Sequence, residues 1–320
     1  MSKARYLCRF HHGMDRDRFG VIVDERLYDL TDVDQPWIAT LCDWLKSAAG
    51  RVPEALEDLS HAVSLVEPVG TMPELLAQGL QLLAPIDEQE VWAAGVTYEM
   101  SREARMRESQ EPTIYGSVYT SDRPELFFKA TPHRVSGPGS AVCIRADSAW
   151  NVPEAELTLL LTPRCEIAGF TVGNDMSSRD IEGANPLYLP QAKCYDRACS
   201  LGPWIRLADP DFDPLAIRVT CQVFRDNQVV FEGSTSTASL HRSFEELLGF
   251  LDRCNCFPCG SFLMTGTGIV PPDTFTLEEG DVVALAIDGI GELRNPVAVL
   301  PVASSAAQSQ RHQDSSISLS

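Results

Sequence analysis

Residues 151–161, NVPEAELTLLL, combine two glutamates with the pattern of a buried strand. Residues 157–161 form an apolar run broken only by one threonine, which is typical of a strand buried on both faces. Glu154 and Glu156 open this run, and side chains two residues apart point to the same face of a strand. Two carboxylates held together against an apolar core repel each other and lose hydration. The stretch therefore predicts that something positively charged lies between them.

A third carboxylate follows the next predicted strand. Asp175 comes nineteen residues after Glu156, directly behind the segment IAGFTVG at 167–173. Three carboxylates from adjacent strands can converge on one point, and ligands that are all oxygen suit Mg²⁺, with Mn²⁺ as a second possibility. We therefore predict a metal site formed by Glu154, Glu156 and Asp175. A pair of surface glutamates on an edge strand is the alternative, and the E-x-E pattern alone would favour it.

Composition limits the classes of function. The chain has 320 residues, a net charge of −19 and a pI near 4.6. Such an acidic surface argues against non-specific binding of nucleic acid or of an anionic membrane. No window reaches the roughly 18 apolar residues of a membrane span, and the N-terminus lacks the apolar core of a secretory signal. We expect a soluble, cytoplasmic protein.

The pattern along the chain predicts a mostly β fold with helices, of the α+β class. Residues 1–85 are expected to form a small N-terminal α/β domain with a hairpin and two helices, WIATLCDWLKSAAG and MPELLAQGLQLL. Residues 86–303 are rich in strands and turns, with helices at YEMSREARMRES and SFEELLGFLDRC, and should form the catalytic domain. The polar stretch 304–320 is expected to be a disordered tail.

Three of the ten cysteines lie together in CNCFPC, as Cys254, Cys256 and Cys259. Without an export signal the cysteines should be reduced, so no disulfide framework is expected. Zinc would need a fourth ligand, and the spacing to the nearest histidine, His241, fits no common zinc pattern. We expect these three to be small buried apolar residues.

Several motifs in order resemble those of the fumarylacetoacetate hydrolase superfamily over roughly residues 90–302. They are PEAEL, GFTVGNDMSSRDIE, PQAKCYD, LMTGTGIV and LEEGDVVALAIDGIGELRNPV. The resemblance implies a β-roll catalytic domain and Mg²⁺ bound by Glu154, Glu156 and Asp175. It also implies that Lys193 and Thr267 contact the oxo-acid end of a substrate, and that the chain forms a homodimer or homotetramer.

The superfamily catalyses several reactions, and fold alone does not choose among them. Its C–C hydrolases carry a His and a Glu in N-Y-x-x-H-x-x-E, whereas VTYEMSREARM places Ser101 and Ala104 at those positions. Neither side chain can activate water as that pair does, although Glu103 is only one residue off. This departure counts against an acylpyruvate-type hydrolase, which, with oxaloacetate decarboxylase, is the alternative function.

A more detailed resemblance is to the 2-keto-3-deoxy-D-arabinonate dehydratases. It is carried by RPELFFKATPHR at 123–134, IRADSAWNVPEAEL at 144–157 and GANPLYLPQAK at 183–193. It implies a Mg²⁺-dependent hydro-lyase of pentose catabolism. The enzyme would convert a small-molecule 2-keto-3-deoxy sugar acid, 2-dehydro-3-deoxy-D-arabinonate, to 2,5-dioxopentanoate.

The same resemblance suggests roles for individual residues. Glu125 is the first candidate for the catalytic base or acid, and Lys193 is the second. Arg102 is a candidate clamp for a substrate carboxylate or hydroxyl, with an exposed helix arginine as the alternative. Lys129 is expected to point outward from its strand, and His133 to be structural. The sequence does not reveal which group is base and which is acid, nor the configuration of the substrate at C4.

Overall fold

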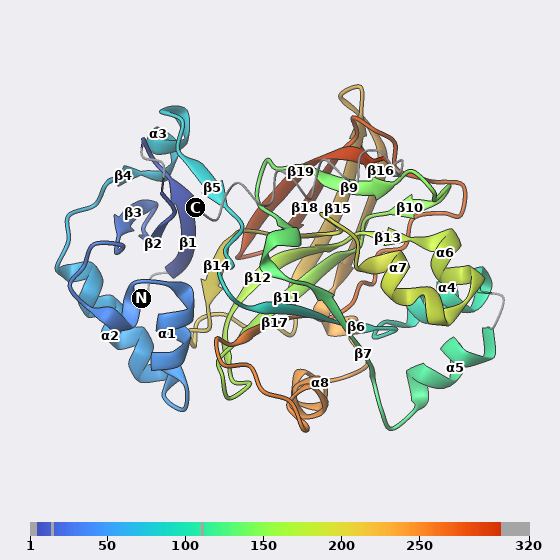
Figure 1. Ribbon diagram of the computed structural model, residues 1–320, viewed down its shortest axis with the longest axis horizontal. Helices are drawn as coiled ribbons and strands as arrows, with labels where there is room; N and C mark the ends of the chain where they lie inside the picture. Colours follow the sequence, from blue (N-terminus) through green and yellow to red (C-terminus); the bar gives the residue numbers. More distant parts are fainter. Residues whose placement is uncertain (1–4, 14–15, 110–111, 302–320) are drawn as a thin grey trace, which may run out of the picture.

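The computed structural model describes residues 5–13, 16–109 and 112–301, and it contains more strand than helix. A 12-stranded sheet and a 5-stranded sheet form the body of the molecule (Figure 1). The predicted mostly β, α+β fold is therefore confirmed. The predicted tail at 304–320 lies outside the described residues.

The strands fall into three groups. Along the large sheet the order is β4 (Gly70–Thr71), β3 (Arg26–Asp29), β2 (Arg18–Val23), β1 (Arg5–His11), β14 (Cys199–Leu207), β12 (Ile167–Asp175), β11 (Ala155–Leu161), β17 (Ser261–Met264), β6 (Glu90–Gly95) and β7 (Glu125–Ala130), with β5 (Gln81–Leu83) beside β1 and β8 (Val135–Ser136) beside β14. The smaller sheet has the order β16 (Gln228–Ser236), β15 (Arg218–Arg225), β18 (Val282–Ile287), β19 (Gly291–Leu300) and β9 (Val142–Arg145). A two-stranded ladder joins β10 (Asn151–Val152) to β13 (Ser177–Ser178).

Strand β11 lies at the centre of the large sheet, and all seven of its residues are buried. Leu157 and Leu159 belong to the core shared with the smaller sheet, whereas Leu160 belongs to the core on the opposite face. That second core also contains Trp44 and Leu59 from the N-terminal helices. Alternate side chains thus enter two different cores, which explains why this strand is an apolar run rather than an alternating one.

The N-terminal elements continue the large sheet. Strand β1 pairs with β14 through Tyr6↔Arg206 and Leu7↔Ile205. Helices α1 (Leu41–Ala48), α2 (Val52–Ser64) and α3 (Met72–Ala77) accompany these strands (Figure 1). A domain boundary near residue 85 stays a prediction.

Two local predictions for this region need correction. Helix α2 was not predicted from the sequence. The expected helix MPELLAQGLQLL ends at Ala77, and its last residues form β5 instead. Gly79 explains the break, because its φ of +92° lies in the left-handed region that ends helices.

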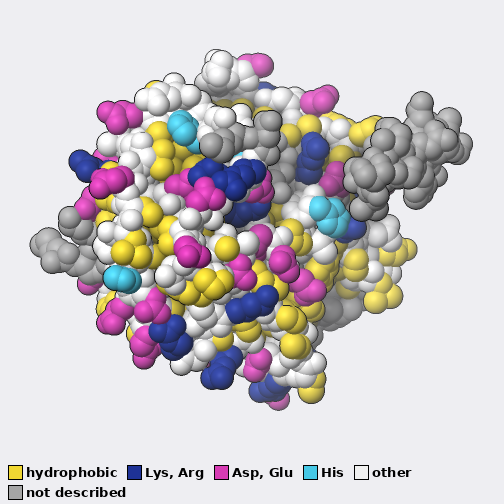
Figure 2. Space-filling view, turned by 60° about the vertical axis from the view of Figure 1, so that its left-hand side comes forward, with side chains coloured by type: hydrophobic (Ala, Val, Ile, Leu, Met, Phe, Trp, Pro, Cys, Tyr) yellow, Lys and Arg dark blue, Asp and Glu magenta, His cyan; other side chains and the backbone are white. Residues whose placement is uncertain are grey.

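The remaining helices flank the large sheet. Helices α4 (Glu99–Glu108), α5 (Pro112–Thr120), α6 (Arg179–Ala184) and α7 (Leu189–Lys193) gather at one end of it, and α8 (Phe244–Leu251) lies apart from them (Figure 1). The 3₁₀ turns are η1 (Pro36–Ile38), η2 (Pro132–Arg134), η3 (Pro186–Tyr188) and η4 (Thr237–Ser239). Among the described residues, no helix combines the length and apolar character that crossing a membrane requires. Acidic and basic side chains are interspersed on the face shown in Figure 2.

The cysteine predictions are wrong in two respects. Cys42 and Cys259 form a disulfide with their Cα atoms 4.8 Å apart, and Cys254 and Cys256 are exposed rather than buried. The two bonded cysteines are 217 residues apart in the chain. Only folding brings the start of α1 beside Cys259, two residues before β17, so the spacing of cysteines could not reveal the pair.

Substitution Leu7→Ala tests the packing of the N-terminal strand β1 in the core that it shares with β11. Leu7 is fully buried in the core that holds Leu160. We expect the free energy of unfolding to fall by about 2–5 kcal/mol, because the substitution removes buried apolar groups and leaves a cavity among packed side chains. The control Leu215→Ala, at an exposed position, should change it by less than about 0.5 kcal/mol. Urea unfolding measures both, and equal effects would contradict the assigned packing.

Candidate active site

The three predicted metal ligands lie together. Glu156 is in β11, Asp175 ends β12, and Glu154 sits between β10 and β11. The antiparallel register pairs Glu156 with Gly173, and the Asp175 N–H donates to the Glu154 carbonyl at 3.0 Å. Carboxylate oxygens of all three lie within 4.8 Å of one another, and each residue is at most 4% exposed. The structure thus brings the predicted triad to one buried point.

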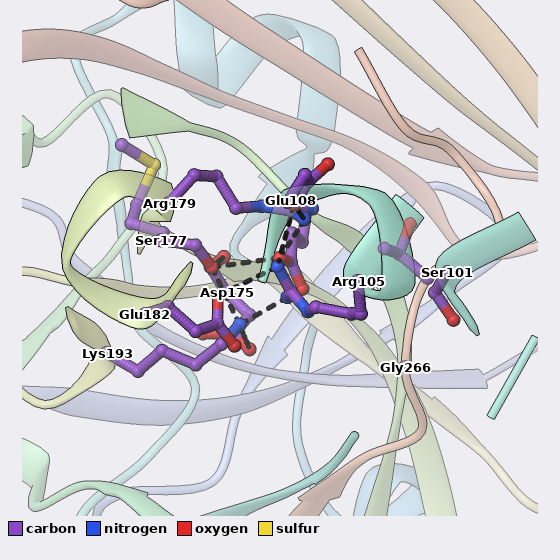
Figure 3. Close-up of polar contacts among 12 residues, drawn as sticks. Ser101, Arg105, Glu108, Asp175, Ser177, Arg179, Glu182, Lys193 and Gly266 are labelled. Atoms are coloured by element: carbon purple, nitrogen blue, oxygen red, sulfur yellow. Dashed lines mark hydrogen bonds and ion pairs between the residues drawn. The ribbon is translucent and has the colours of Figure 1, made fainter. Parts of the chain in front are cut away.

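Three cationic side chains contact Glu154. The Lys193 ammonium lies 3.1 Å from Glu154 Oε2 and 2.8 Å from Asp175 Oδ2. Arg105 Nη2 and Arg179 Nη2 lie 2.9 and 3.0 Å from Glu154 Oε1. Figure 3 shows these side chains converging from α4, α6 and α7. Both oxygens of Glu154 are therefore held by charge-assisted contacts.

Lys129 is part of this cluster, so the prediction that it points outward is wrong. Its ammonium forms an ion pair with Asp175 and donates to the carbonyls of Met176 (3.0 Å) and Lys193. Alternate residues of β7 share a face, so Lys129 lies on the same face as Glu125 and Phe127. Glu125 and Phe127 line a cavity beside the triad. An inward lysine here is tolerated because its charge is paired with Asp175 and two backbone carbonyls accept hydrogen bonds from it.

An outer layer of carboxylates compensates the arginines. Arg105 Nη1 lies 2.8 Å from Glu182, and Arg179 Nη1 donates to Glu108 Oε2 at 2.6 Å. Within the described part of the chain, the cluster has two more carboxylates than cations. The carboxylates are Glu108, Glu125, Glu154, Glu156, Asp175 and Glu182, and the cations are Arg105, Lys129, Arg179 and Lys193. This excess of carboxylates favours the binding of an added cation.

The least compensated carboxylate of the triad is Glu156. Burial, together with the charges of Asp175 and Glu154, raises its pKa well above the usual value, and the Gly266 N–H at 2.6 Å opposes this only in part. Burial alone would also raise the pKa of Glu154, but Lys193, Arg179 and Arg105 hold it far below its ordinary range. A buried all-oxygen set with one under-compensated member fits a hard divalent cation such as Mg²⁺.

Two members of the triad, Glu154 and Asp175, line a cavity that also contains Glu125, Lys193 and Thr267. Glu125 faces Gly95 across the β6–β7 ladder, and a Cβ on Gly95 would lie only 2.1 Å from Glu125 Oε2. The glycine therefore leaves the space that this carboxylate occupies. Burial, and next the charge of Glu182, raise the pKa of Glu125 to about 7. Such a group can both accept and donate a proton near neutral pH.

Arg102 is not brought to the cavity. It pairs with Glu99, and its guanidinium lies 4.9 Å from the ring centre of Tyr119. Arg105, three residues later on α4, lines the cavity instead. His133 forms a local contact with Thr131 at 3.1 Å.

Four side chains that the sequence analysis did not single out belong to the site: Arg105, Glu108, Arg179 and Glu182. Two of them stand in the quoted motif GFTVGNDMSSRDIE, at its Arg and its final Glu. Their spacing of three residues places both on one side of a short helix, which was an available signal.

Comparison with known proteins agrees with this geometry. Residues 90–298 match the family model described as fumarylacetoacetate (FAA) hydrolase, C-terminal. The chain belongs to the fumarylacetoacetate hydrolase family. The resemblance inferred from its motifs is thereby confirmed.

Two curated relatives are dehydratases by name. The chain is 44% identical over 274 residues to a probable 2-keto-3-deoxyxylonate dehydratase of Haloferax volcanii, covering 86% of this chain and 93% of the relative. It is 40% identical over 251 residues to 2-dehydro-3-deoxy-D-arabinonate dehydratase of Saccharolobus solfataricus, covering 77% and 84%. A solved structure of 2-keto-3-deoxy-D-arabinonate dehydratase, complexed with magnesium and 2,5-dioxopentanoate, superposes with a TM-score of 0.76. It is 33% identical, and the alignment covers 92% of this chain and 99% of that one.

Neutralising one ligand should weaken metal binding. We expect Glu156→Gln to raise the Kd for Mn²⁺, measured by calorimetry, by at least about 100-fold, because a charged ligand is lost. Glu292→Gln changes an exposed glutamate outside the site and should leave the Kd within about twofold. Unchanged binding by Glu156→Gln would remove the triad as the metal site.

The raised pKa of Glu125 predicts a pH-dependent stability in the presence of EDTA. A carboxyl pKa raised from 4.5 to about 7 favours the protonated folded form. Its stabilising contribution is complete below pH 4.5 and is lost as the pH rises through about 7. Between about pH 5 and 8 the wild type should therefore lose roughly 1–3 kcal/mol relative to Glu125→Gln. Thermal melts across this range check it, and parallel curves for the two proteins would contradict it.

Proposed function

We propose that this protein is a Mg²⁺-dependent dehydratase that converts 2-dehydro-3-deoxy-D-arabinonate to 2,5-dioxopentanoate. The single observation that carries the proposal is that one cavity adjoins two separate groups. One is the carboxylate triad suited to a divalent cation, two members of which line the cavity, and the other is Glu125, whose raised pKa lets it carry a proton near neutral pH. The similarity to two dehydratases over most of the chain supports the same assignment.

Glu154, Glu156 and Asp175 would hold the metal ion. When bound, Mg²⁺ supplies polarisation of the 2-oxo group, which makes the C3 protons of the substrate more acidic. Lys193 provides a buried positive charge for the oxo-acid end, and the Thr267 hydroxyl lies in the same cavity. Glu125 is placed to move the proton at C3 or at the C4 oxygen.

The reaction balances without any further reagent. A base takes one C3 proton, the C4–O bond breaks, and the hydroxyl leaves as water with a proton from the acid. This gives an alkene between C3 and C4. A proton then moves from C5 to C3, and the C4–C5 enol that results becomes the aldehyde. The overall change is the loss of one water molecule.

The cavity lacks the water-activating pair of the family's hydrolases. Ser101 stands at the histidine position and donates to the Tyr98 carbonyl at 2.8 Å, and Ala104 is buried at the glutamate position. Neither is a base. This observation favours dehydration over C–C hydrolysis.

The names of the two relatives are compatible with one substrate. In a 2-keto-3-deoxy pentonate, C2 is a carbonyl and C3 is a methylene, so C4 is the only stereocentre left. D-xylose and D-arabinose share the configuration at C4. The acids derived from these two D sugars are therefore the same compound.

Three further features belong to the proposal. We expect a homodimer or homotetramer, a cytoplasmic location, and a boundary near residue 85 between the N-terminal part and the catalytic part. Size-exclusion chromatography with light scattering would determine the oligomeric state.

The test is an assay of the purified chain with 2-keto-3-deoxy-D-arabinonate and Mg²⁺, with products followed by NMR. We expect 2,5-dioxopentanoate, and we expect Glu125→Gln to lower kcat by at least about 100-fold because general acid–base catalysis is lost. Glu232→Gln, at an exposed strand position, should retain wild-type kcat.

Two results would overturn the proposal. One is the absence of 2,5-dioxopentanoate while pyruvate forms from an acylpyruvate or from oxaloacetate. The other is unchanged turnover in Glu125→Gln, which would remove this residue from the chemistry.

A further inference from the structure

The cysteine cluster CNCFPC, residues 254–259, takes no part in the proposed active site, and its last cysteine forms a disulfide. Cys259 is bonded to Cys42, and Cys256 precedes Cys259 with the spacing C-x-x-C. The intervening Phe257 is buried and packs edge-on against Trp92, with ring centres 6.2 Å apart. The Gly260 N–H donates to the Phe257 carbonyl at 2.9 Å, which closes a turn around Cys259. The two cysteines therefore flank an anchored segment.

The three cysteines differ in exposure. Cys42 is 1% exposed, Cys259 is partly exposed, and Cys256 is free and exposed. Cys259 is therefore the more accessible end of the disulfide for a nucleophile. Thiols of a C-x-x-C motif, three positions apart in the chain, can exchange with each other, and the attacking species is the thiolate.

Charge near the disulfide favours an internal attacker. Glu88 Oε2 lies 3.3 Å from the Cys259 sulfur, and Asp87 accepts a hydrogen bond from the Cys42 N–H at 3.0 Å. Two carboxylates repel an anionic thiol such as glutathione as it approaches from solvent. Cys256 is held only three positions from Cys259 in the chain, and the high effective concentration of such a tethered thiol offsets this repulsion.

We propose that Cys256, Cys259 and Cys42 form a thiol–disulfide exchange site for small thiols and disulfides of the glutathione class. The Cys256 thiolate attacks Cys259 Sγ. A Cys256–Cys259 bond forms as the Cys42–Cys259 bond breaks, and Cys42 leaves as a thiolate that takes a proton from water. No net electrons move in this step.

Oxidation and reduction of the site need an external partner. Two small thiols reduce the Cys256–Cys259 bond to two protein thiols and leave as one small disulfide. In the opposite direction, one small disulfide accepts two electrons from Cys42 and Cys259 and leaves as two thiols.

The site is connected to the active site through two parallel strands. Gln89, directly before β6, donates to the Cys259 carbonyl at 3.0 Å, and β17 begins two residues after Cys259. Strands β6 and β17 pair in parallel. Strand β6 ends at Gly95, and the chain after Met264, the last residue of β17, forms the Gly266–Thr267 turn; all three residues Gly95, Gly266 and Thr267 line the cavity. The disulfide therefore ties α1 to the starting ends of both strands.

The experiment uses the full chain, oxidised with glutathione disulfide. Opening of the Cys42–Cys259 bond by glutathione is followed by timed alkylation and peptide mass mapping. We expect Cys256→Ser to open at least about tenfold more slowly than the parent, because the tethered thiol is gone. Cys254→Ser is the matched control, an equally exposed cysteine without the C-x-x-C spacing, and should open within about twofold of the parent. With the neutral thiol 2-mercaptoethanol, the deficit of Cys256→Ser should shrink.

A second variant tests directly whether Cys256 and Cys259 can form a bond. Cys42→Ser treated with glutathione disulfide should form a Cys256–Cys259 bond. Its melting temperature should not respond to dithiothreitol, whereas that of the oxidised parent should fall by at least about 4 °C. The proposal fails if Cys256→Ser opens as fast as the parent, or if Cys42 and Cys259 are both alkylated in the oxidised parent.

Discussion

Three carboxylates are buried within 4.8 Å of one another, and the surrounding strands and helices are arranged so that cationic side chains compensate their charge. Unpaired, such a group would be strongly destabilising, because burial removes hydration and adds mutual repulsion. The fold compensates it with four cations drawn from four elements: Arg105 of α4, Lys129 of β7, Arg179 of α6 and Lys193 of α7. The gathering of these helices at one end of the large sheet is therefore an electrostatic requirement as well as a packing one.

The cationic side chains are distributed unevenly among the carboxyl groups, so the glutamates differ in pKa. Glu154 is contacted by three cations and stays ionised, whereas Glu156 has one backbone N–H and its pKa is raised. Glu125 lies in the same cavity but has a pKa near neutrality. Carboxyl groups whose environments push their pKa values apart can divide metal binding from proton transfer within one site.

The large sheet also transmits constraints over distance. Strands β6 and β17 run in parallel, so their starting ends meet on one side and their finishing ends on the other. The first side holds the Cys42–Cys259 bond, and the second leads to Gly95 and to the turn at Gly266. A covalent link and a catalytic cavity thus share the same pair of strands, while the buried β11 holds them in register through β17.

Local sequence patterns were enough to predict the central strands and the three carboxylates that the structure brings together. Both depend on short-range rules: an apolar run buried on two faces, two glutamates at i and i+2, and an aspartate that ends the adjacent antiparallel strand. Tertiary structure alone decided which cations enter the site. Arg102 and Arg105 differ by about 60° around one helix axis, and only the packing of α4 turns Arg105 inward. Lys129 faces in because β7 borders the cavity, and Cys42 meets Cys259 across 217 residues. No local periodicity encodes contacts of that range, since they arise only when separate elements pack together.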